Sequence, residues 1–446
     1  MKAFRLPTGK TAGLLGFGTS NQTLLDFLLR QGMSVTVRDR RPINDQTLAL
    51  RGVRCCTGEG YLDDLCEDIL FRSPGMRPDA APIQAALARG ARLSGEYDLF
   101  ASLCPATLLG VTGSDGKTTT TTIAGLMLRE AGHTVYVGGN IGRPLIGDLP
   151  AMQAGDFALA ELSSFQLMTA PRPPHRAVIT NVTENHLNWH RDMQEYAAAK
   201  EHILGPATHA VLNAHNPYTA AIARRRAHKT LFSATLDSRT LRAEFGACHT
   251  VTVEGEALAY DGKPLFPVSD VRLPGQHNLE NYLAAIGLVY PYANARAMQN
   301  VARSFGGVRH RMECLGVADG VTYYNSSIDS TPSRTAATLA ALGSKPILLC
   351  GGADKGLSLA PLRCAAEAHA GAIILFGQAR ERLHEALCDL ALRIEVCTSM
   401  HEAVALAKAI ARPGDSILLS PACTSFDEFN NFEERGEAFR QAFLGE

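Results

Sequence analysis

Short apolar runs alternate with amphipathic stretches along most of this chain. The apolar run 11–15 precedes an amphipathic stretch at 23–30, and the next run, 34–39, ends in an acid. Further apolar runs follow the same plan at residues 108–112, 157–162, 177–182, 210–212, 346–352, 372–377 and 416–421. Strands that alternate with helices are typical of parallel sheets covered by helices on both faces. The pattern predicts an α/β protein.

Two breaks in this pattern divide the chain into predicted domains. A helical stretch ends near 103–105, directly before an apolar strand, and the strand pattern restarts after Gly306-Gly307. The length of 446 residues also suggests about three domains of roughly 150 residues. We therefore expect domains at 1–104, 105–305 and 306–446, with the first and third built as Rossmann-like units. Short alternating runs between about 230 and 273 predict a small antiparallel sheet in the middle domain.

Net charge and cysteine usage narrow the class of protein. A formal net charge of -1 gives no electrostatic reason to expect nucleic acid or an anionic membrane as partner. The eleven cysteines include no C-x-x-C pair, which favours reduced thiols in a cytoplasmic protein. Lys2 and Arg5 precede the first apolar run, but that run turns at Gly16. We therefore expect neither a signal peptide nor membrane insertion.

Residues 108–122 read L-L-G-V-T-G-S-D-G-K-T-T-T-T-T and predict a phosphate-binding loop. An apolar strand leads into a glycine turn, and a helix begins whose amide groups and positive end attract phosphate. Lys117 would neutralise phosphate charge, and the Thr118 hydroxyl would face a magnesium ion. The predicted nucleotide contacts are Gly113, Ser114, Asp115, Gly116, Lys117, Thr118 and Thr119. The alternative is a glycine-lysine helix start that binds no nucleotide.

A second glycine turn, Gly16-Phe17-Gly18, follows the first apolar run. Strand, turn, helix and a strand ending in Asp39 form a Rossmann half-unit. The third glycine of the dinucleotide motif would fall at Asn21, so a nucleotide other than NAD is favoured. A purely structural turn is the alternative. Ser73-Pro74-Gly75 follows another apolar run and is expected to face the same crevice.

Polar side chains after two middle-domain strands predict a metal site. Glu161 ends an apolar run, where the carboxyl end of a parallel strand would aim a hard oxygen ligand beside the phosphate loop. His186 follows the next strand, at a place suited to a metal or phosphate contact. A solvated strand-end acid and a helix-capping histidine are the alternatives. From residue chemistry alone, Lys200 is interpreted as a solvated helix lysine.

The compact loop motif T-G-x-[ND]-G-K-[ST]-T resembles the Mur ligase family, whose members use ATP to join an amino acid to a carboxylate. Similar matches occur in E-L-S-S-F-Q-L at 161–167 and in G-Q-H-N-L-E-N at 275–281. The motif S-P-A-C-T-S-F-D-E-F-N-N-F-E-E-R-G, at 420–436, is most similar to that of the D-glutamate-adding members. Asn185 and Asn188 stand where the family commonly has acids, so these two positions carry no carboxylate.

The resemblance implies a reaction and its substrates. ATP would phosphorylate the alanyl carboxylate of UDP-N-acetylmuramoyl-L-alanine, and the amine of D-glutamate would attack the acyl phosphate. The product would be a peptidoglycan precursor, made by a monomer that uses two Mg²⁺ ions and a carbamylated Lys200. The implied catalytic residues are Lys117, His186 and Lys200, and the implied metal contacts are Thr118, Glu161, His186 and Lys200.

The resemblance also assigns binding residues in all three predicted domains. Besides the phosphate loop, ATP would contact His277, Asn278, Asn281, Arg311 and Asp329. Asp329 is assigned because Ser326 occupies the usual aspartate position of the family. The UDP substrate would contact Ser20, Asp39, Gly75, Asn140 and His186, and glutamate would contact Lys355, Ser425 and Phe432.

Two hypotheses from other classes stay open at this point. A dehydrogenase would use the Gly16 turn for a nicotinamide cofactor and would leave the Lys117 loop without a role. A regulatory P-loop protein would hydrolyse ATP without needing a UDP-sugar. Nucleotide binding with and without UDP-muramoyl-alanine separates the three hypotheses.

Overall fold

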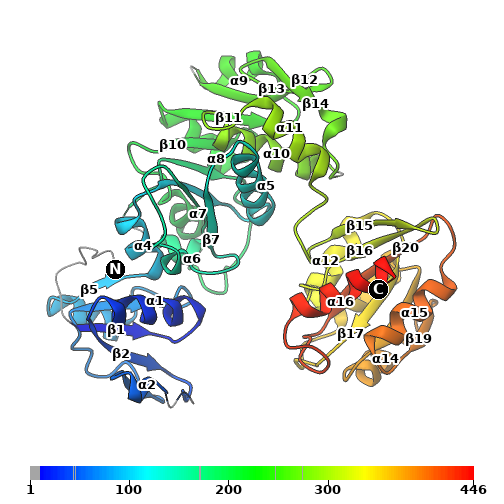
Figure 1. Ribbon diagram of the computed structural model, residues 1–446, viewed down its shortest axis with the longest axis horizontal. Coiled ribbons are helices and arrows are strands. Elements are labelled where there is room, and N and C mark those ends of the chain that lie inside the picture. The colour runs from blue at the N-terminus through cyan, green and yellow to red at the C-terminus, as the bar shows by residue number, and fades with distance from the viewer. Residues whose placement is uncertain are drawn as a thin grey trace. The chain divides into compact units, whose positions relative to one another are not determined.

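The structure is a computed structural model that describes residues 11–445, apart from 44, 46, 170, 171, 247 and 274. Lys2, Arg5 and the first ten positions of the predicted first domain lie outside the described residues, as does Glu446. The chain forms two compact units, Met1–Phe305 and Gly306–Glu446. Both units combine helices and strands, so the predicted α/β class is confirmed (Figure 1). No helix in the described part of the chain is long and apolar enough to cross a membrane.

The first sheet, blue in Figure 1, has five parallel strands in the order β3-β2-β1-β4-β5. Its strands are β1 (Thr11–Leu15), β2 (Ser34–Asp39), β3 (Arg54–Thr57), β4 (Ile69–Arg72) and β5 (Arg92–Ser94). The helices of this region are α1 (Thr19–Arg30), α2 (Thr47–Leu50), α3 (Ala81–Ala88) and α4 (Glu96–Leu103). Because β1 lies between β2 and β4, the loops after these three strands meet at one edge of the sheet.

The second sheet has nine strands in the order β14-β13-β12-β11-β10-β9-β6-β8-β7. Its strands are β6 (Thr107–Thr112), β7 (Val135–Gly139), β8 (Phe157–Glu161), β9 (Arg176–Ile179), β10 (His209–Asn213), β11 (Lys229–Ser233), β12 (His249–Glu254), β13 (Ala257–Tyr260) and β14 (Lys263–Pro267). The strands from β6 to β12 pair in parallel, and β13 and β14 form an antiparallel edge. The expected antiparallel strands are present, as a continuation of the main sheet through β12.

Helices pack against this nine-stranded sheet. They are α5 (Lys117–Glu130), α6 (Ser164–Leu167), α7 (Met193–Glu201), α8 (Pro217–Arg225), α9 (Ser238–Phe245), α10 (Gln276–Val289) and α11 (Ala295–Ser304), with single 3-10 turns at Leu145–Gly147 and Val268–Asp270. All five residues of β8 are buried, as expected for a central parallel strand that is covered on both faces. One hydrophobic cluster runs from the first sheet through α4 into the second, and Leu14, Phe100 and Leu162 belong to it.

The second unit contains a sheet in the order β15-β16-β20-β17-β18-β19. Its strands are β15 (Glu313–Ala318), β16 (Val321–Asn325), β17 (Ile347–Gly351), β18 (Ala372–Phe376), β19 (Arg393–Val396) and β20 (Ser416–Ala422). Its helices are α12 (Pro332–Leu342), α13 (Ala360–His369), α14 (Arg380–Leu387), α15 (Met400–Ile410) and α16 (Phe432–Leu444). Leu348 of β17 packs in one core and its neighbour Leu349 in another, because successive strand residues face opposite sides. Helices therefore cover both faces of this sheet.

Candidate functional site

The phosphate loop lies between the end of β6 and the start of α5. Gly113 has φ 152° and Gly116 has φ 75°, conformations that glycine adopts far more readily than other residues. A Cβ atom at Gly113 would clash with Thr180 Oγ1, and one at Gly116 would clash with Asn281 Oδ1. Among the described residues, no side chain caps the start of α5. Its first amide groups are therefore suited to a phosphate ligand.

Hydrogen bonds lock this loop against the segment that follows β9. The Ser114 hydroxyl donates to Thr183 O at 3.0 Å and accepts from Thr183 N at 2.9 Å. The amide of Asp115 donates to Asn181 Oδ1 at 2.9 Å. Ser114 is buried, whereas Asp115 is exposed. Ser114 and Asp115 are both predicted ATP contacts; the Ser114 side chain maintains the loop, and Asp115 faces outward.

Lys117 lies over the loop at the start of α5. Its Nζ donates to Gly113 O at 2.9 Å and to Ser114 O at 2.8 Å. The next two residues, Thr118 and Thr119, are half-buried in the first turn of the helix. The structure thus places an ammonium group and the positive end of a helix at the same loop, which favours an anionic ligand.

Glu161 is the last residue of β8, and only one of its two carboxylate oxygens has a hydrogen-bond partner among the described residues. Its side chain is 1% exposed. Oε1 accepts a hydrogen bond from Asn140 Nδ2 at 3.0 Å, while Oε2 has no hydrogen-bond partner among the described residues. An unpaired buried carboxylate oxygen is energetically costly, and a divalent cation would compensate for it. Asn140, predicted to contact the UDP substrate, is here a hydrogen-bond partner of Glu161.

Lys200, on α7, is 2% exposed, so the interpretation of a solvated lysine is wrong. Its Nζ donates to Gly113 O at 2.7 Å and lies 4.5 Å from the ring centre of Tyr196. Burial, followed by the charge of Lys117, lowers the pKa of Lys200 to about 6, despite the opposing effect of nearby carboxylates. The amine is therefore largely neutral at pH 7, the form that reacts with carbon dioxide.

His186 lies on the segment after β9 with φ 56°, in the left-handed region. Its ring meets the edge of Phe165 at a centroid distance of 5.0 Å. Burial lowers the pKa of His186, and the charges of Lys117 and Lys200 lower it further. A neutral imidazole is the form that binds a metal ion. His186 is only partly enclosed, and it lies on the surface together with the neighbouring Asn185 and Asn188.

The donor set around the loop is too small for a metal site made of protein ligands alone. In the described ranges, no three His, Cys, Asp or Glu side chains come together as a metal site. One carboxylate (Glu161), one hydroxyl (Thr118) and one imidazole (His186) lie around the loop. Mg²⁺ commonly takes few protein ligands and completes its shell with water and substrate phosphates. The residues therefore fit a magnesium ion that is shared with a nucleotide.

A second helix contributes to the floor of this site. Asn281 of α10 is buried, and its Oδ1 accepts a hydrogen bond from Thr120 Oγ1 at 3.2 Å. The contact joins α10 to α5, directly behind the phosphate loop. Asn281 Nδ2 donates to Asn278 Oδ1 at 3.4 Å, and His277 is exposed at the start of α10. The structure thus brings Asn281, with Asn278 bonded to it, to the phosphate loop, whereas His277 is exposed at the start of the same helix.

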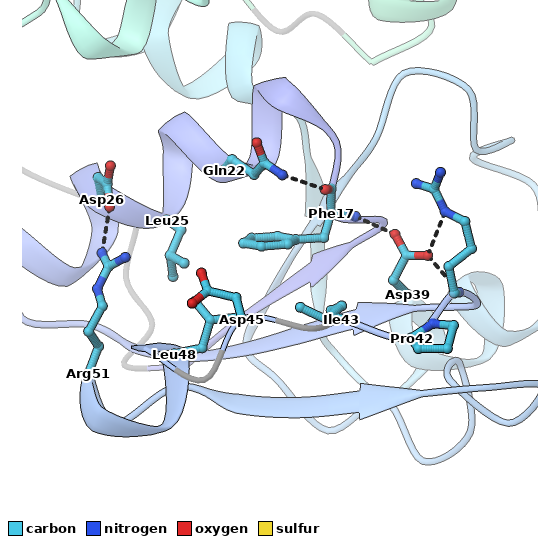
Figure 2. Close-up of a pocket in the computed structure, with 11 residues that line it drawn as sticks. Phe17, Gln22, Leu25, Asp26, Asp39, Pro42, Ile43, Asp45, Leu48 and Arg51 are labelled. Atoms are coloured by element: carbon cyan, nitrogen blue, oxygen red, sulfur yellow. Dashed lines mark hydrogen bonds and ion pairs between the residues drawn. The ribbon is translucent and has the colours of Figure 1, made fainter. Parts of the chain in front are cut away.

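A pocket of about 560 Å³ lies at the carboxyl ends of β1 and β2. Figure 2 shows the Phe17 ring beside Leu25 and Ile43, with polar groups around the rim. The lining residues are Phe17, Gln22, Leu25, Asp26, Asp39, Arg41, Pro42, Ile43, Asp45, Leu48 and Arg51. An aromatic ring on an apolar floor with polar groups at the rim suits a planar, polar ligand such as a nucleobase.

Asp39 lines this pocket, but both of its carboxylate oxygens accept hydrogen bonds from backbone amides. Oδ2 accepts from Phe17 N at 2.7 Å, and Oδ1 accepts from Arg41 N at 2.8 Å (Figure 2). Burial alone would raise the pKa of Asp39, but these amide donors and the Arg41 charge hold it below its ordinary value. Asp39 therefore fixes the glycine turn and the next loop in place. Ser20 lies elsewhere, in a smaller hollow with Arg72 and Thr169.

Gly75 lies where the first and second sheets meet. Its carbonyl accepts a hydrogen bond from Trp189 Nε1 at 2.8 Å. Arg77 of the same loop pairs with Glu195 of α7 at 2.9 Å. Arg72, at the end of β4, donates to Phe165 O at 2.5 Å. The loop after β4 is thus held against the segments that carry His186 and Lys200.

Several residues of these sites were not predicted from the sequence. Phe17, Ile43 and Leu48 form the floor of the first pocket, and Trp189 contacts the Gly75 loop. Only the aromatic residue inside the glycine turn, Phe17, carried a local signal. The others come together through the strand order, which the sequence pattern did not give.

In the second unit, two neighbouring strands present the predicted glutamate contacts. Lys355 is exposed in the loop after β17, and Ser425 is buried after β20. Ala353 and Thr424 exchange backbone hydrogen bonds of 2.9 and 3.0 Å, which hold these two loops together. Phe432 begins α16 and is half-buried, with its ring 6.2 Å from that of His310.

Asp329 follows β16 and is buried. Its Oδ2 accepts hydrogen bonds from Thr338 Oγ1 at 2.7 Å and from Ser420 Oγ at 2.8 Å. Ser326, at the usual aspartate position, is also buried, and its hydroxyl accepts from Met312 N at 3.1 Å. Arg311 lies next to Met312 and is exposed. At least one oxygen of Asp329 thus holds the unit together.

Three protein-family descriptions match the chain. The Mur ligase MurD-like N-terminal domain matches residues 10–95, the Mur ligase middle domain matches 111–289, and the Mur ligase glutamate ligase domain matches 310–423. A UDP-N-acetylmuramoylalanine–D-glutamate ligase from Symbiobacterium thermophilum is 41% identical over 446 residues and covers 96% of each chain. The ligase of the same name from Clostridium perfringens is 38% identical, over 97% of this chain and 96% of its own.

Solved structures share the fold at lower identity. UDP-N-acetylmuramate–alanine ligase from Thermotoga maritima has a TM-score of 0.57 and 17% identity, over 98% of this chain and 99% of its own. A UDP-N-acetylmuramoyl-L-alanyl-D-glutamate–2,6-diaminopimelate ligase has the same TM-score and 16% identity, over 99% of this chain and 94% of its own. With sequence relatives this similar over almost the whole length, the chain belongs to the Mur ligase family.

Proposed function

We propose that this Mur ligase adds D-glutamate to UDP-N-acetylmuramoyl-L-alanine at the expense of ATP, in peptidoglycan precursor synthesis. The observation that carries the proposal is the phosphate loop with Lys117 beside the buried, unpaired Oε2 of Glu161. This pairing suits a nucleotide with a bound cation. The names of the similar relatives supply the substrates.

The chemistry needs two steps because a carboxylate is a poor acyl donor. The alanyl carboxylate oxygen attacks the γ-phosphorus of ATP, and ADP leaves. The glutamate amine then attacks the acyl phosphate carbon, loses a proton and expels phosphate from a tetrahedral intermediate. Lys117 and the amides of the loop would stabilise the negative charge on the phosphates in both steps. A side-chain nucleophile is not required.

Magnesium would bind Thr118, Glu161 and His186, with Lys200 contributing as a carbamate, and it would neutralise phosphate charge when bound. Two ions are proposed. The low pKa of Lys200 supports carbamylation, because the buried amine is already largely neutral at pH 7. Carbamylation joins the nitrogen of the neutral amine to the carbon of carbon dioxide, releases one proton and leaves an anionic carbamate. The product would complement the cation that Glu161 also requires.

The UDP substrate would use the first sheet. We assign the uracil to the pocket lined by Phe17 and Asp39, and the diphosphate path to the Gly75 loop. Ser20 and Asn140 stay proposed contacts further along the substrate, and the Glu161 bond of Asn140 links that path to the metal side. Because the Asp39 carboxylate already accepts hydrogen bonds from two backbone amides, we propose that Asp39 shapes this pocket.

The remaining assignments rest on the family resemblance and on local geometry. Glutamate would bind at the joined loops after β17 and β20, through Lys355, Ser425 and Phe432. Besides the loop, ATP would contact His277, Asn278, Asn281, Arg311 and Asp329. We also propose the domain limits 1–104, 105–305 and 306–446, a monomeric state and a cytoplasmic location.

A ligation assay tests the function directly. Radiolabelled D- or L-glutamate is incubated with UDP-N-acetylmuramoyl-L-alanine, ATP and Mg²⁺, and the UDP-linked product is separated. Product formed from D-glutamate with one ADP released per bond is expected. ATP hydrolysis without need for the UDP substrate would instead favour a regulatory P-loop protein. Nicotinamide binding at the Gly16 turn would favour a dehydrogenase.

A further inference from the structure

A buried histidine, His190, lies next to the candidate site and has no assigned role. It is 2% exposed and is the second histidine of the segment T-E-N-H-L-N-W-H. Its Nε2 lies 2.9 Å from Ser164 Oγ. Its Nδ1 lies 3.3 Å from Glu195 Oε2, at ion-pair distance but without hydrogen-bond alignment. The carboxylate favours a hydrogen on Nδ1, so that Nε2 accepts from the Ser164 hydroxyl.

The ring of His190 is also packed between aromatic side chains. It stacks on Phe165 at 5.6 Å with an interplanar angle of 10°, and it meets Tyr196 edge-on at 5.2 Å. Phe165 in turn touches His186, and the hydroxyl of Tyr196 lies 2.9 Å from Ser114 Oγ of the phosphate loop. The histidine is therefore held by contacts on both its nitrogens and its faces.

These contacts join three segments, each of which carries one proposed metal-side residue. Ser164 begins the turn directly after the strand that ends in Glu161. The backbone of His190 itself donates to His186 O at 3.0 Å and closes the turn that presents His186. Glu195 lies on α7, the helix that carries Lys200. In the described structure, His190 is thus in direct contact with all three segments.

We propose that His190 is a positioning residue that holds Glu161, His186 and Lys200 in register for a magnesium-bound nucleotide. The inference rests on the proposed ATP-dependent function. Side chains behind the direct ligands of a metal commonly change its affinity by about 10- to 100-fold when they are replaced. Removing the ring nitrogens would break the polar contacts of His190 with Ser164 and Glu195, so its backbone bond to His186 O would be the one polar tie left through this residue.

The test compares His190→Phe with His190→Gln in the full-length protein. Phenylalanine keeps the ring stack but loses both polar contacts, whereas glutamine can still accept from Ser164. Mg²⁺ titration into protein saturated with a non-hydrolysable ATP analogue, followed by calorimetry, measures magnesium affinity without turnover. We expect about 10- to 100-fold weaker Mg²⁺ binding for His190→Phe and partial recovery for His190→Gln.

His209→Phe is the matched control. His209 also uses Nε2 to contact a hydroxyl, Thr230 Oγ1 at 2.8 Å, in the same nine-stranded sheet. Its replacement should change the melting temperature but leave the Mg²⁺ affinity unchanged. If His190→Phe does not fold, Ser164→Ala removes the same hydrogen bond with a smaller change in volume.

The results distinguish failure of the His190 positioning role from failure of the proposed ATP-dependent function. Unchanged Mg²⁺ affinity in folded His190→Phe, or in Ser164→Ala where that variant replaces it, would overturn the positioning role. Equal weakening in His209→Phe would show a general loss of stability and would also overturn it. Absence of Mg²⁺-dependent analogue binding in the wild-type protein would remove the proposed function, and the inference with it.

Discussion

Burial sets the chemistry of single side chains at this site. Lys117 and Lys200 are both lysines that donate to the same carbonyl, Gly113 O. Lys117 is half-buried at a helix start, whereas Lys200 is almost wholly enclosed. Enclosure disfavours the charged form, so the two lysines are suited to opposite tasks. One would supply a cation to phosphate, and the other would supply a neutral amine for carbamylation.

Lys200 should carry a carbamate that depends on pH. With ¹³C-bicarbonate, a lysine carbamate resonance should appear near pH 7.5 and fade as the pH falls through about 6, because protonation removes the reactive amine. Lys200→Arg should lack the resonance and lose turnover by about 10²-fold or more, since a cation replaces an anion. A Lys200→Arg variant with normal turnover, or a fully active enzyme without the resonance, would contradict the proposal.

Lys117→Ala should lower turnover on the order of 10²-fold or more while leaving the fold intact. The backbone amides of the loop cannot replace the lost positive charge. Steady-state kinetics at saturating ATP and a thermal melt measure the two effects separately. Lys263→Ala, at an exposed position of β14, is the control and should match the wild-type protein. Near-normal turnover of Lys117→Ala would mean that the loop does not hold the reacting phosphates.

At the scale of elements, the candidate site residues lie at the ends of strands and helices. The loops after β6, β8 and β9 place the phosphate loop, Glu161 and the His186 segment side by side, because these strands are neighbours in the sheet. Glycine is needed where a loop approaches another element closely. Gly116 is such a point, since it has a positive φ and its Cβ position faces Asn281 of α10.

Gly116→Ala should therefore weaken nucleotide binding strongly. The added methyl group would clash with the Asn281 side chain of α10, and a left-handed conformation costs a non-glycine residue about 1–3 kcal/mol. Calorimetry with an ATP analogue and thermal unfolding provide the measurements. Gly155→Ala is the matched control, because its Cβ position meets open space without a positive φ. Equal ATP affinity of both variants would show that the close approach at Gly116 is unimportant.

At the scale of the whole molecule, the first two sheets act as one compact unit. Their shared hydrophobic cluster and the polar contacts of the Gly75 loop join the proposed UDP path to the proposed ATP site. The unit 306–446 has its own core and carries the proposed glutamate contacts. Two compact units suit an enzyme that binds its substrates in separate places and combines them during turnover.

The only tryptophan of the chain should report on UDP-substrate binding. Trp189 donates its indole hydrogen to Gly75 O, so a ligand on the Gly75 loop should change its fluorescence. We expect a saturable change with UDP-N-acetylmuramoyl-L-alanine and a weaker response to glutamate alone. Trp189→Phe should abolish the signal while the ligand still binds in calorimetry. A silent Trp189 at saturating substrate would argue against the proposed diphosphate path.

Local order was predictable from the sequence because it depends on neighbouring residues. Strand, glycine turn, lysine and helix follow one another in 108–122, and the expected loop lies between β6 and α5. The α/β class and the Mur ligase family were predicted and are confirmed. The individual site residues stay predictions, although the structure brings Lys117, Glu161 and Lys200 to one place.

Tertiary structure alone decided which side chains are enclosed and what they meet. Residue chemistry alone indicated an exposed Lys200, although the family resemblance implied a metal-side role, and the packing of α7 on the phosphate loop is what buries it. The pairing of Asn140 with Glu161 and the enclosure of His190 likewise join residues far apart in the chain. Hydrophobic periodicity shows which face of an element is apolar, but partners across elements follow from strand order, which the periodicity does not contain.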